Sequence, residues 1–174
     1  SNHLEAEQEV KVYARTANLV MELLVEEGDE VKKDQVLLRL EDTDQNLSYK
    51  KTLSQLNQAT DNFARTEKMF KDELVPQKEY DDEKHALQQL KISLEEAERQ
   101  VAFTEVKAPI SGTITARMVK LGDQVNANQH LFDIIDFDSI VARVYVAESH
   151  LENLQTNQPV RLVAKSLHDQ VFDG

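Results

Sequence analysis

Histidines are the first residues of this 174-residue chain whose type could support metal binding. An HExxH segment would place two histidines on one face of a helix with a glutamate between them, the arrangement that holds zinc. None of the five histidines stands in such a segment, so we interpret them as isolated surface side chains and expect no metal site. They are His3, His85, His130, His150 and His168.

Carboxylates form two runs that could act on paper as a general acid and a general base, Asp81-Asp82-Glu83 and Glu95-Glu96. Both runs fall in a segment with helical periodicity and nothing nearby to shape a pocket, so we interpret them as a solvated face. The absence of cysteine excludes a thiol nucleophile, a disulfide framework and a Cys-ligated metal site. Neither a glycine-rich phosphate loop nor a nucleophile elbow occurs. We expect no catalytic residue, no cofactor and no enzyme activity.

The charge of the chain is acidic, with 20 basic and 32 acidic residues and a net charge of −12. The acidic residues are spread out and no basic stripe interrupts them, which disfavours nucleic acid and anionic membrane surfaces as partners. No run approaches the ~20 apolar residues that span a bilayer. Ser1-Asn2 has the character of a cloning remnant, so we expect an export signal and a membrane anchor to have been removed from the N-terminus.

The elements that must position any site are organised around an internal repeat. A shift of 94 residues brings two segments into register, with near-alternating Val, Leu and Ile on either side of a Gly-Asp turn. Asn18 then meets Gly112 and Asp34 meets Asn128, residue types that tolerate positive φ. We predict strand, turn and strand in each copy, and a small sandwich of both. The matched pairs are Val20/Ile114, Val25/Val119, Gly28-Asp29/Gly122-Asp123, Val31/Val125, Gln35/Gln129, Leu37/Leu131, Leu40/Ile134 and Asp42/Asp136.

Between the copies, residues 43–105 have a heptad period. Apolar positions alternate at spacings of three and four on two arms, which predicts an antiparallel coiled-coil hairpin of helices about 40 Å long. Pro76 lies between the arms and suits the first turn of the second helix, where its missing N–H costs nothing. The predicted seam is Leu53, Leu56, Thr60, Phe63, Glu67, Phe70 and Leu74 on the first arm, and Tyr80, Glu83, Leu87, Leu90, Leu94, Ala97, Val101 and Thr104 on the second.

The C-terminal part changes pattern again. A strand is predicted over residues 139–146, a short helix over residues 148–154 and another strand over residues 159–164. We therefore expect an α+β chain in three parts: a split β-sandwich over residues 10–42 and 106–136, the hairpin over residues 43–105, and part of a β-barrel, truncated, over residues 137–174.

This order of parts resembles the periplasmic adaptor (membrane fusion) proteins of Gram-negative tripartite efflux and secretion systems. The resemblance covers about residues 10–174 and implies that the sandwich is a biotinyl/lipoyl-like domain with the hairpin inserted between its halves. Gly28, Asp29, Gly112, Gly122 and Asp123 are then its turn residues. The motifs that carry the resemblance are VEEGDEVKK from Val25, QVLL from Gln35 and VKAPISGTI from Val106.

Residues 65–80 resemble the hairpin tip of adaptors that serve resistance–nodulation–division pumps. The tip pattern of that family has Arg, three residues, Leu, six residues and Ser. Arg65 matches it, Met69 replaces the Leu, and Pro76 departs from the Ser, whose hydroxyl would cap the next helix. The resemblance implies that Arg65, Met69, Lys71, Val75 and Pro76 meet an outer-membrane channel. Taken alone, Arg65 would instead be expected to pair with neighbours such as Asp61 or Glu67.

A biotinyl/lipoyl-like fold also raises the alternative of a swinging-arm carrier. A carrier needs a lysine at the turn that joins its two halves, and here the hairpin occupies that junction. Lys107 lies nearby, but it falls in a predicted strand, so we disfavour this alternative.

The resemblance implies a non-catalytic, periplasmic adaptor that is held at the inner membrane. Its implied partners are an inner-membrane transporter, more of the resistance–nodulation–division than of the ABC type, an outer-membrane channel, and further copies of itself in a trimer or hexamer. The alternative is a structural coiled-coil protein of the envelope that takes no part in transport.

Overall fold

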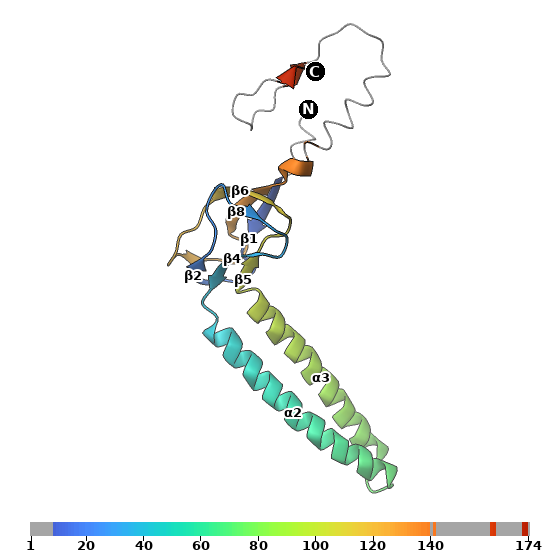
Figure 1. Ribbon diagram of the computed structural model, residues 1–174. Helices are drawn as coiled ribbons and strands as arrows, with labels where there is room; N and C mark the ends of the chain where they lie inside the picture. Colours follow the sequence, from blue (N-terminus) through green and yellow to red (C-terminus); the bar gives the residue numbers. More distant parts are fainter. Residues whose placement is uncertain (1–8, 140, 142–160, 163–171, 174) are drawn as a thin grey trace, which may run out of the picture. The chain divides into compact units, whose positions relative to one another are not determined.

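The computed structural model of the chain describes residues 9–139, 141, 161–162 and 172–173. The chain divides into one unit of residues 1–137 and a second unit of residues 138–174, and each is described here by itself. In the first unit, two helices extend as a hairpin from a module of short strands (Figure 1).

Two four-stranded antiparallel sheets make up the β module, and each sheet takes two strands from each half of the repeat. The first sheet has the order β1-β8-β6-β3 and the second the order β5-β4-β2-β7. In each sheet two central strands from one half are flanked by two strands from the other half, so neither half can form its sheet alone. The bounds are β1 Glu9–Tyr13, β2 Asn18–Leu23, β3 Glu30–Val31, β4 Val36–Leu40, β5 Glu105–Lys107, β6 Gly112–Arg117, β7 Gln124–Val125 and β8 His130–Ile135.

The 94-residue shift carries one sheet onto the other, hydrogen bonds included. The N–H of Gly28 donates to the carbonyl of Ile114 at 2.8 Å, and the N–H of Gly122 donates to the carbonyl of Val20 at 2.9 Å. These two glycines have φ of 94° and 85°, the left-handed region that glycine enters without steric cost. The repeat predicted from the sequence is therefore a quasi-twofold relation between the sheets.

The predicted positive-φ positions divide into one pair that is confirmed and one that is wrong. Asp34 and Asn128 have φ of 69° and 65°. Asn18 and Gly112 do not take positive φ but begin β2 and β6. Gly112 is required for another reason: a Cβ at that position would lie 2.5 Å from the backbone oxygen of Ile135 on the neighbouring strand.

The core of the module fills the space between the sheets. Both halves contribute fully buried side chains, among them Leu37 and Leu38 from β4 and Leu131, Phe132 and Ile134 from β8. Because β4 and β8 are equivalent in the repeat, the core carries the same quasi-symmetry as the hydrogen bonds. The predicted split sandwich is confirmed.

The inserted hairpin consists of α2, Thr43–Lys71, and α3, Gln77–Ala102, packed antiparallel along the predicted seam. On the second arm every seam residue is buried or half-buried. On the first arm two positions were wrong, since Thr60 and Leu74 are exposed and Thr66 is buried in their place. Leu74 is exposed because it lies beyond Lys71, the last residue of α2.

The first residue of β2 and the connection before it contact both legs of the hairpin where they leave the module. The Asn18 amide donates to the Glu41 carboxylate at 3.0 Å, and the same carboxylate accepts the N–H of Thr43 at 2.9 Å. These bonds, from Thr43 first and from Asn18, lower the pKa of Glu41 below its ordinary value. On the other leg the Arg15 guanidinium lies 4.6 Å from the ring centroid of Phe103.

In the second unit, β9 (Arg161–Leu162) pairs antiparallel with β10 (Phe172–Asp173). Residues 137–139 and 141 are helical, so the strand expected from Ser139 does not begin there. The helix predicted over residues 148–154 and most of the strands predicted on either side of it lie outside the described residues. Within the described part of the chain, no helix is both long and apolar enough to cross a membrane.

Candidate docking site at the hairpin tip

The tip of the hairpin is built by the way α2 ends. The N–H of Leu74 donates to the carbonyl of Met69 at 2.9 Å, and the N–H of Glu73 donates to the carbonyl of Phe70 at 3.0 Å. This pair of bonds is a Schellman motif, in which the residue after the C-cap adopts a left-handed conformation. That residue is usually glycine, but here it is Glu73 with φ of 60°. The last carbonyls of α2 are thereby satisfied and the chain reverses within a few residues.

Pro76 is the N-cap of the second helix, α3, which begins at Gln77. This places Pro76 one position before the first turn in which the sequence placed it. Its carbonyl accepts the N–H groups of Glu79 and Tyr80 at 3.1 and 3.3 Å, but no side chain caps the helix. Replacement of the expected serine therefore leaves the N-terminus of α3 without a side-chain cap.

Beneath the tip, an aromatic cluster holds the two helices together. The Tyr80 ring stacks on Phe70 with centroids 4.5 Å apart and contacts Phe63 at 5.4 Å. These contacts fix the last two turns of α2 against the first turn of α3. The turn above them is thus presented on a rigid support.

Apolar side chains at the tip are exposed. Leu74 has a relative exposure of 69% and Met69 one of 42%, while Val75 is half-buried. Lone exposed apolar residues are normal on a protein surface. Here two of them lie close together in the chain, Met69 on the last turn of α2 and Leu74 in the connection that follows. The tip therefore offers a small apolar surface at the far end of a rod.

The amino-acid sequence of this module matches a known family. Residues 8–136 match the family described as the CzcB-like, barrel-sandwich hybrid domain. The chain belongs to this family. The predicted resemblance to membrane fusion proteins is confirmed, and the alternative of a structural coiled-coil protein outside transport is not favoured.

Individual relatives of the CzcB-like chain agree with this assignment. The cobalt-zinc-cadmium resistance protein CzcB of Cupriavidus metallidurans is 25% identical over 178 residues, which cover 94% of this chain and 34% of that protein. This chain thus spans about a third of the length of its curated relative.

Two solved structures share the fold. One is a MacA–MexA chimeric protein that contains the Pseudomonas aeruginosa MexA α-hairpin domain, with a TM-score of 0.71 and 24% identity over 74% of this chain and 48% of that one. The other is the membrane fusion protein Spr0693 from Streptococcus pneumoniae R6, with a TM-score of 0.62 and 18% identity over 95% of this chain and 78% of that one.

The last two turns of α2 carry Arg65, Met69 and Lys71 of the predicted tip residues. The connection from α2 to α3 carries the other two, Val75 and Pro76. Arg65 is exposed two turns before the end of α2, where its guanidinium donates to the side-chain oxygen Oδ1 of Asn62 at 2.7 Å, a partner that the sequence did not suggest. Lys71 is the last residue of α2 and forms a 3.6 Å ion pair with Glu67.

Leu74 is the most exposed apolar residue of the tip, but the sequence did not predict it as a docking residue. The predicted heptad register continued through this position and assigned Leu74 to the seam. The signal that could have ended the register earlier is Pro76, since the residue before a proline avoids helical conformation. The usual glycine signal of a Schellman motif was absent because Glu73 holds that position.

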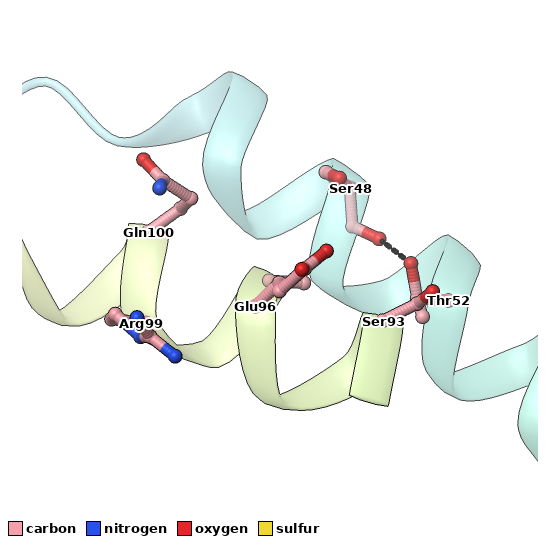
Figure 2. Close-up of a pocket in the computed structure, with 7 residues that line it drawn as sticks. Ser48, Thr52, Ser93, Glu96, Arg99 and Gln100 are labelled. Atoms are coloured by element: carbon pink, nitrogen blue, oxygen red, sulfur yellow. Dashed lines mark hydrogen bonds between the residues drawn. The ribbon is translucent and has the colours of Figure 1, made fainter. Parts of the chain in front are cut away.

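A shallow polar groove of about 530 Å³ lies between the helices toward the base of the hairpin (Figure 2). Thr52 Oγ1 donates to the Ser48 carbonyl at 2.9 Å along its α2 side. Its lining lacks the buried, convergent polar groups of a binding pocket for small molecules. The lining residues are Ser48, Thr52, Ser93, Glu96, Ala97, Arg99 and Gln100.

Two further side chains with possible chemical roles, His130 and Lys107, each lie beside a carboxylate. His130 is half-buried, its Nε2 lies 2.5 Å from Asp133 Oδ1, and its ring contacts Tyr13. It is therefore not the isolated surface side chain that the sequence predicted. Within the described residues no group of three or more metal-ligating side chains comes together. Lys107 lies in β5 and forms an ion pair with Glu105 at 3.5 Å.

The acidic run Asp81-Asp82-Glu83 is not uniformly solvated. Asp82 accepts from Lys78 at 2.7 Å, but one carboxylate oxygen of Glu83 is buried without a hydrogen-bond partner. This follows from its seam position, which faces the partner helix rather than solvent.

Proposed function

We propose that this chain is part of a periplasmic adaptor that links an inner-membrane transporter to an outer-membrane channel and catalyses no reaction. The observation that carries the proposal is the apolar surface at the end of the hairpin, where Met69 and Leu74 are exposed and Val75 is half-buried. A hairpin of 29 and 26 residues reaches far beyond the module, and its tip has no role in the module's core.

The tip residues contact the channel in this proposal. Met69 and Leu74 supply apolar area, while Arg65 and Lys71 stand beside them on the last turns of α2. Methionine and arginine are enriched in protein interfaces, which agrees with Met69 and Arg65 as contact residues. The tip fits a partner whose receiving surface has an apolar pocket and carboxylates.

The transporter at the inner membrane is proposed to be of the resistance–nodulation–division type rather than the ABC type. Support comes from the tip pattern in which Arg65 and Met69 take the family's positions.

A site-specific photo-cross-linker at position 69 of the full-length protein, in its own cells, tests the docking role. The expected result is capture of an outer-membrane channel, identified by mass spectrometry. The matched control carries the cross-linker at Gln88, which is exposed on α3 well away from the tip. Capture of the channel from both positions alike, or from neither in a folded and exported protein, would overturn the proposal.

A further inference from the structure

The three methionines of the sequence all lie on the surface of the described chain. Met21, Met69 and Met118 have relative exposures of 56%, 42% and 45%. Leu37 and Leu131, by contrast, each have a relative exposure of 0%. Because the sequence contains no cysteine, the methionine thioethers are its only sulfur groups. Exposed thioethers react with two-electron oxidants and become sulfoxides.

Met69 differs from the other two methionines by its place. Met21 lies in β2 and Met118 directly follows β6, so both belong to the β module. Met69 lies on the last turn of α2, in the apolar surface proposed above to contact the channel. An oxidation at this position therefore changes the docking surface, whereas oxidation of Met21 or Met118 does not.

The tip pattern described above has leucine at the position of Met69. Leucine and methionine are similar in volume and apolarity, so either can supply a buried contact. Only methionine has a sulfur atom, and its oxidation converts an apolar side chain into a polar one. Methionine thus makes docking sensitive to oxidants at a position where leucine would not.

From this placement we propose that Met69 is an oxidation site and that its sulfoxide weakens docking of the hairpin tip. The inference rests on the docking role proposed above and adds a regulation of that same site. Oxidants act on undocked copies, because a docked Met69 is covered by the channel. Oxidation therefore shifts the protein toward the undocked state.

Hypochlorous acid is a two-electron oxidant that carries out this step. The sulfur lone pair of Met69 takes the chlorine of hypochlorous acid as Cl⁺, and hydroxide leaves. A water oxygen then binds to the sulfur, chloride leaves and two protons are released. In sum, the thioether and hypochlorous acid give the sulfoxide, chloride and a proton. Sulfur loses two electrons in this reaction and chlorine gains them.

The sulfoxide at position 69 weakens the contact with the channel in two ways. Its oxygen must give up bound water when the channel covers it, and an unpaired polar group at an apolar contact lowers affinity. Arg65 also lies four residues before Met69, on the same side of α2. Its guanidinium has five donors, of which one bonds to Asn62 Oδ1 at 2.7 Å. A further donor can reach the sulfoxide oxygen, which draws Arg65 away from the channel.

The fold of the hairpin does not depend on the Met69 side chain. Met69 belongs neither to the predicted seam nor to the aromatic cluster of Phe63, Phe70 and Tyr80. Its role in the Schellman motif is a backbone one, since its carbonyl accepts the N–H of Leu74. We therefore expect the sulfoxide to weaken binding while the helical circular dichroism at 222 nm is retained.

Oxidation of the purified full-length protein tests the inference. A photo-cross-linker at Gln77, the exposed first residue of α3, reports docking while position 69 stays methionine. The protein is treated with hypochlorous acid, freed of the oxidant and mixed with outer membranes from its own cells. We expect mass spectrometry to find the sulfoxide at Met69, and capture of the channel to fall about five-fold or more. Methionine sulfoxide reductases for both sulfoxide epimers should restore capture.

Met69→Leu and Met21→Leu are the matched variants, and each is compared with its own untreated sample. Hypochlorous acid should lower capture by Met69→Leu less than about two-fold, because leucine cannot form a sulfoxide. Met21→Leu should remain as sensitive as the unmodified protein. An equal loss in Met69→Leu, or full capture by protein whose Met69 is converted, would overturn the inference. So would a Met69 that stays reduced while Met21 and Met118 are oxidised.

The untreated sample separates this inference from the docking proposal. Absence of capture there would count against docking, and the inference would fall with it. Capture that persists after conversion of Met69 would count against the inference alone. Loss of capture together with the helical signal would show that oxidation unfolds the hairpin, and would overturn an effect confined to the docking surface.

Discussion

The β module and the hairpin are stabilised in different ways. Nine large side chains of the module are almost completely buried, and its strands bond across both halves of the repeat. In the hairpin only Thr66, Leu87 and Ala97 are buried among the described residues of α2 and α3. The module therefore has a core that is its own, whereas the hairpin has a narrow seam and leaves most of its surface available to partners.

The largest effect is expected from a charge in the hairpin seam. Leu90 is half-buried in the seam, so Leu90→Asp should cost about 3 kcal/mol, because the seam loses an apolar contact and the unpaired carboxylate is partly removed from water. We expect helical circular dichroism at 222 nm to fall strongly while the amide dispersion of the module persists in NMR spectra.

Gln89→Asp is the control for Leu90→Asp, since Gln89 is the exposed neighbour on the same helix. It should leave the helical signal unchanged. Survival of the helical signal in Leu90→Asp would contradict the paired-helix arrangement, and collapse of the module with it would contradict the independence of its core.

Within the module, Gly112 offers the next largest effect. A Cβ there would lie 2.5 Å from the oxygen and 2.9 Å from the carbon of the Ile135 backbone, so Gly112→Ala must displace the β6–β8 pair. We expect a loss of about 1–3 kcal/mol in the free energy of unfolding, measured by urea titration. Asn18→Gly, at the equivalent position of the first half, should lose less, about 1 kcal/mol from its hydrogen bonds to Glu41. Equal stability of Gly112→Ala and the unmodified protein would contradict the close approach.

Much of this architecture was predictable from the sequence. The 94-residue repeat works as a signal because both halves meet the same backbone requirements at Gly28, Gly122, Asp34 and Asn128. The heptad pattern predicts the hairpin because α2 and α3 pack against each other along a single seam. What the repeat cannot reveal is that each sheet takes strands from both halves, since the match concerns local conformation and says nothing of pairing between distant strands.

The details of the tip were less predictable. Leu74 keeps the apolar spacing of a seam residue but lies beyond the end of α2. The residue that ends the helix in the left-handed conformation is Glu73, so the glycine that usually indicates a helix end is absent. The sequence also did not predict the His130–Asp133 contact, because residues at i and i+3 are neighbours in a helix but not in a regular strand. Both residues lie in β8, whose pairing with β1 has a register irregularity between Val12 and Tyr13.

Glu73 gives a prediction in which the protein gains stability. A non-glycine residue in the left-handed region costs about 1 kcal/mol, so Glu73→Gly should stabilise the hairpin by about 0.5–1 kcal/mol. The thermal midpoint of the 222 nm signal is expected to rise. Asp72→Gly, at φ of −87°, is the control and should lower that midpoint instead, because the added chain flexibility brings no relief. A lowered midpoint for Glu73→Gly would contradict the assigned tip geometry.

The smallest expected effect concerns the junction where module and hairpin meet. Hydrogen bonds from Thr43 and Asn18 lower the pKa of Glu41 below its ordinary value of 4.5, because they favour the ionised carboxylate. Its contribution to stability is therefore fully present above about pH 4.5 and is lost as the pH falls through the lower pKa of the folded state. Exchange of the Asn46 amide, whose N–H donates to the Asp42 carbonyl in the first turn of α2, should report this loss. The difference in its protection between the unmodified protein and Glu41→Gln should shrink below about pH 4, while amides of the aromatic cluster at Tyr80 keep theirs. A difference that is independent of pH would mean that the Glu41 carboxylate does not join the two parts, and that the hairpin leaves the module without a polar anchor on α2.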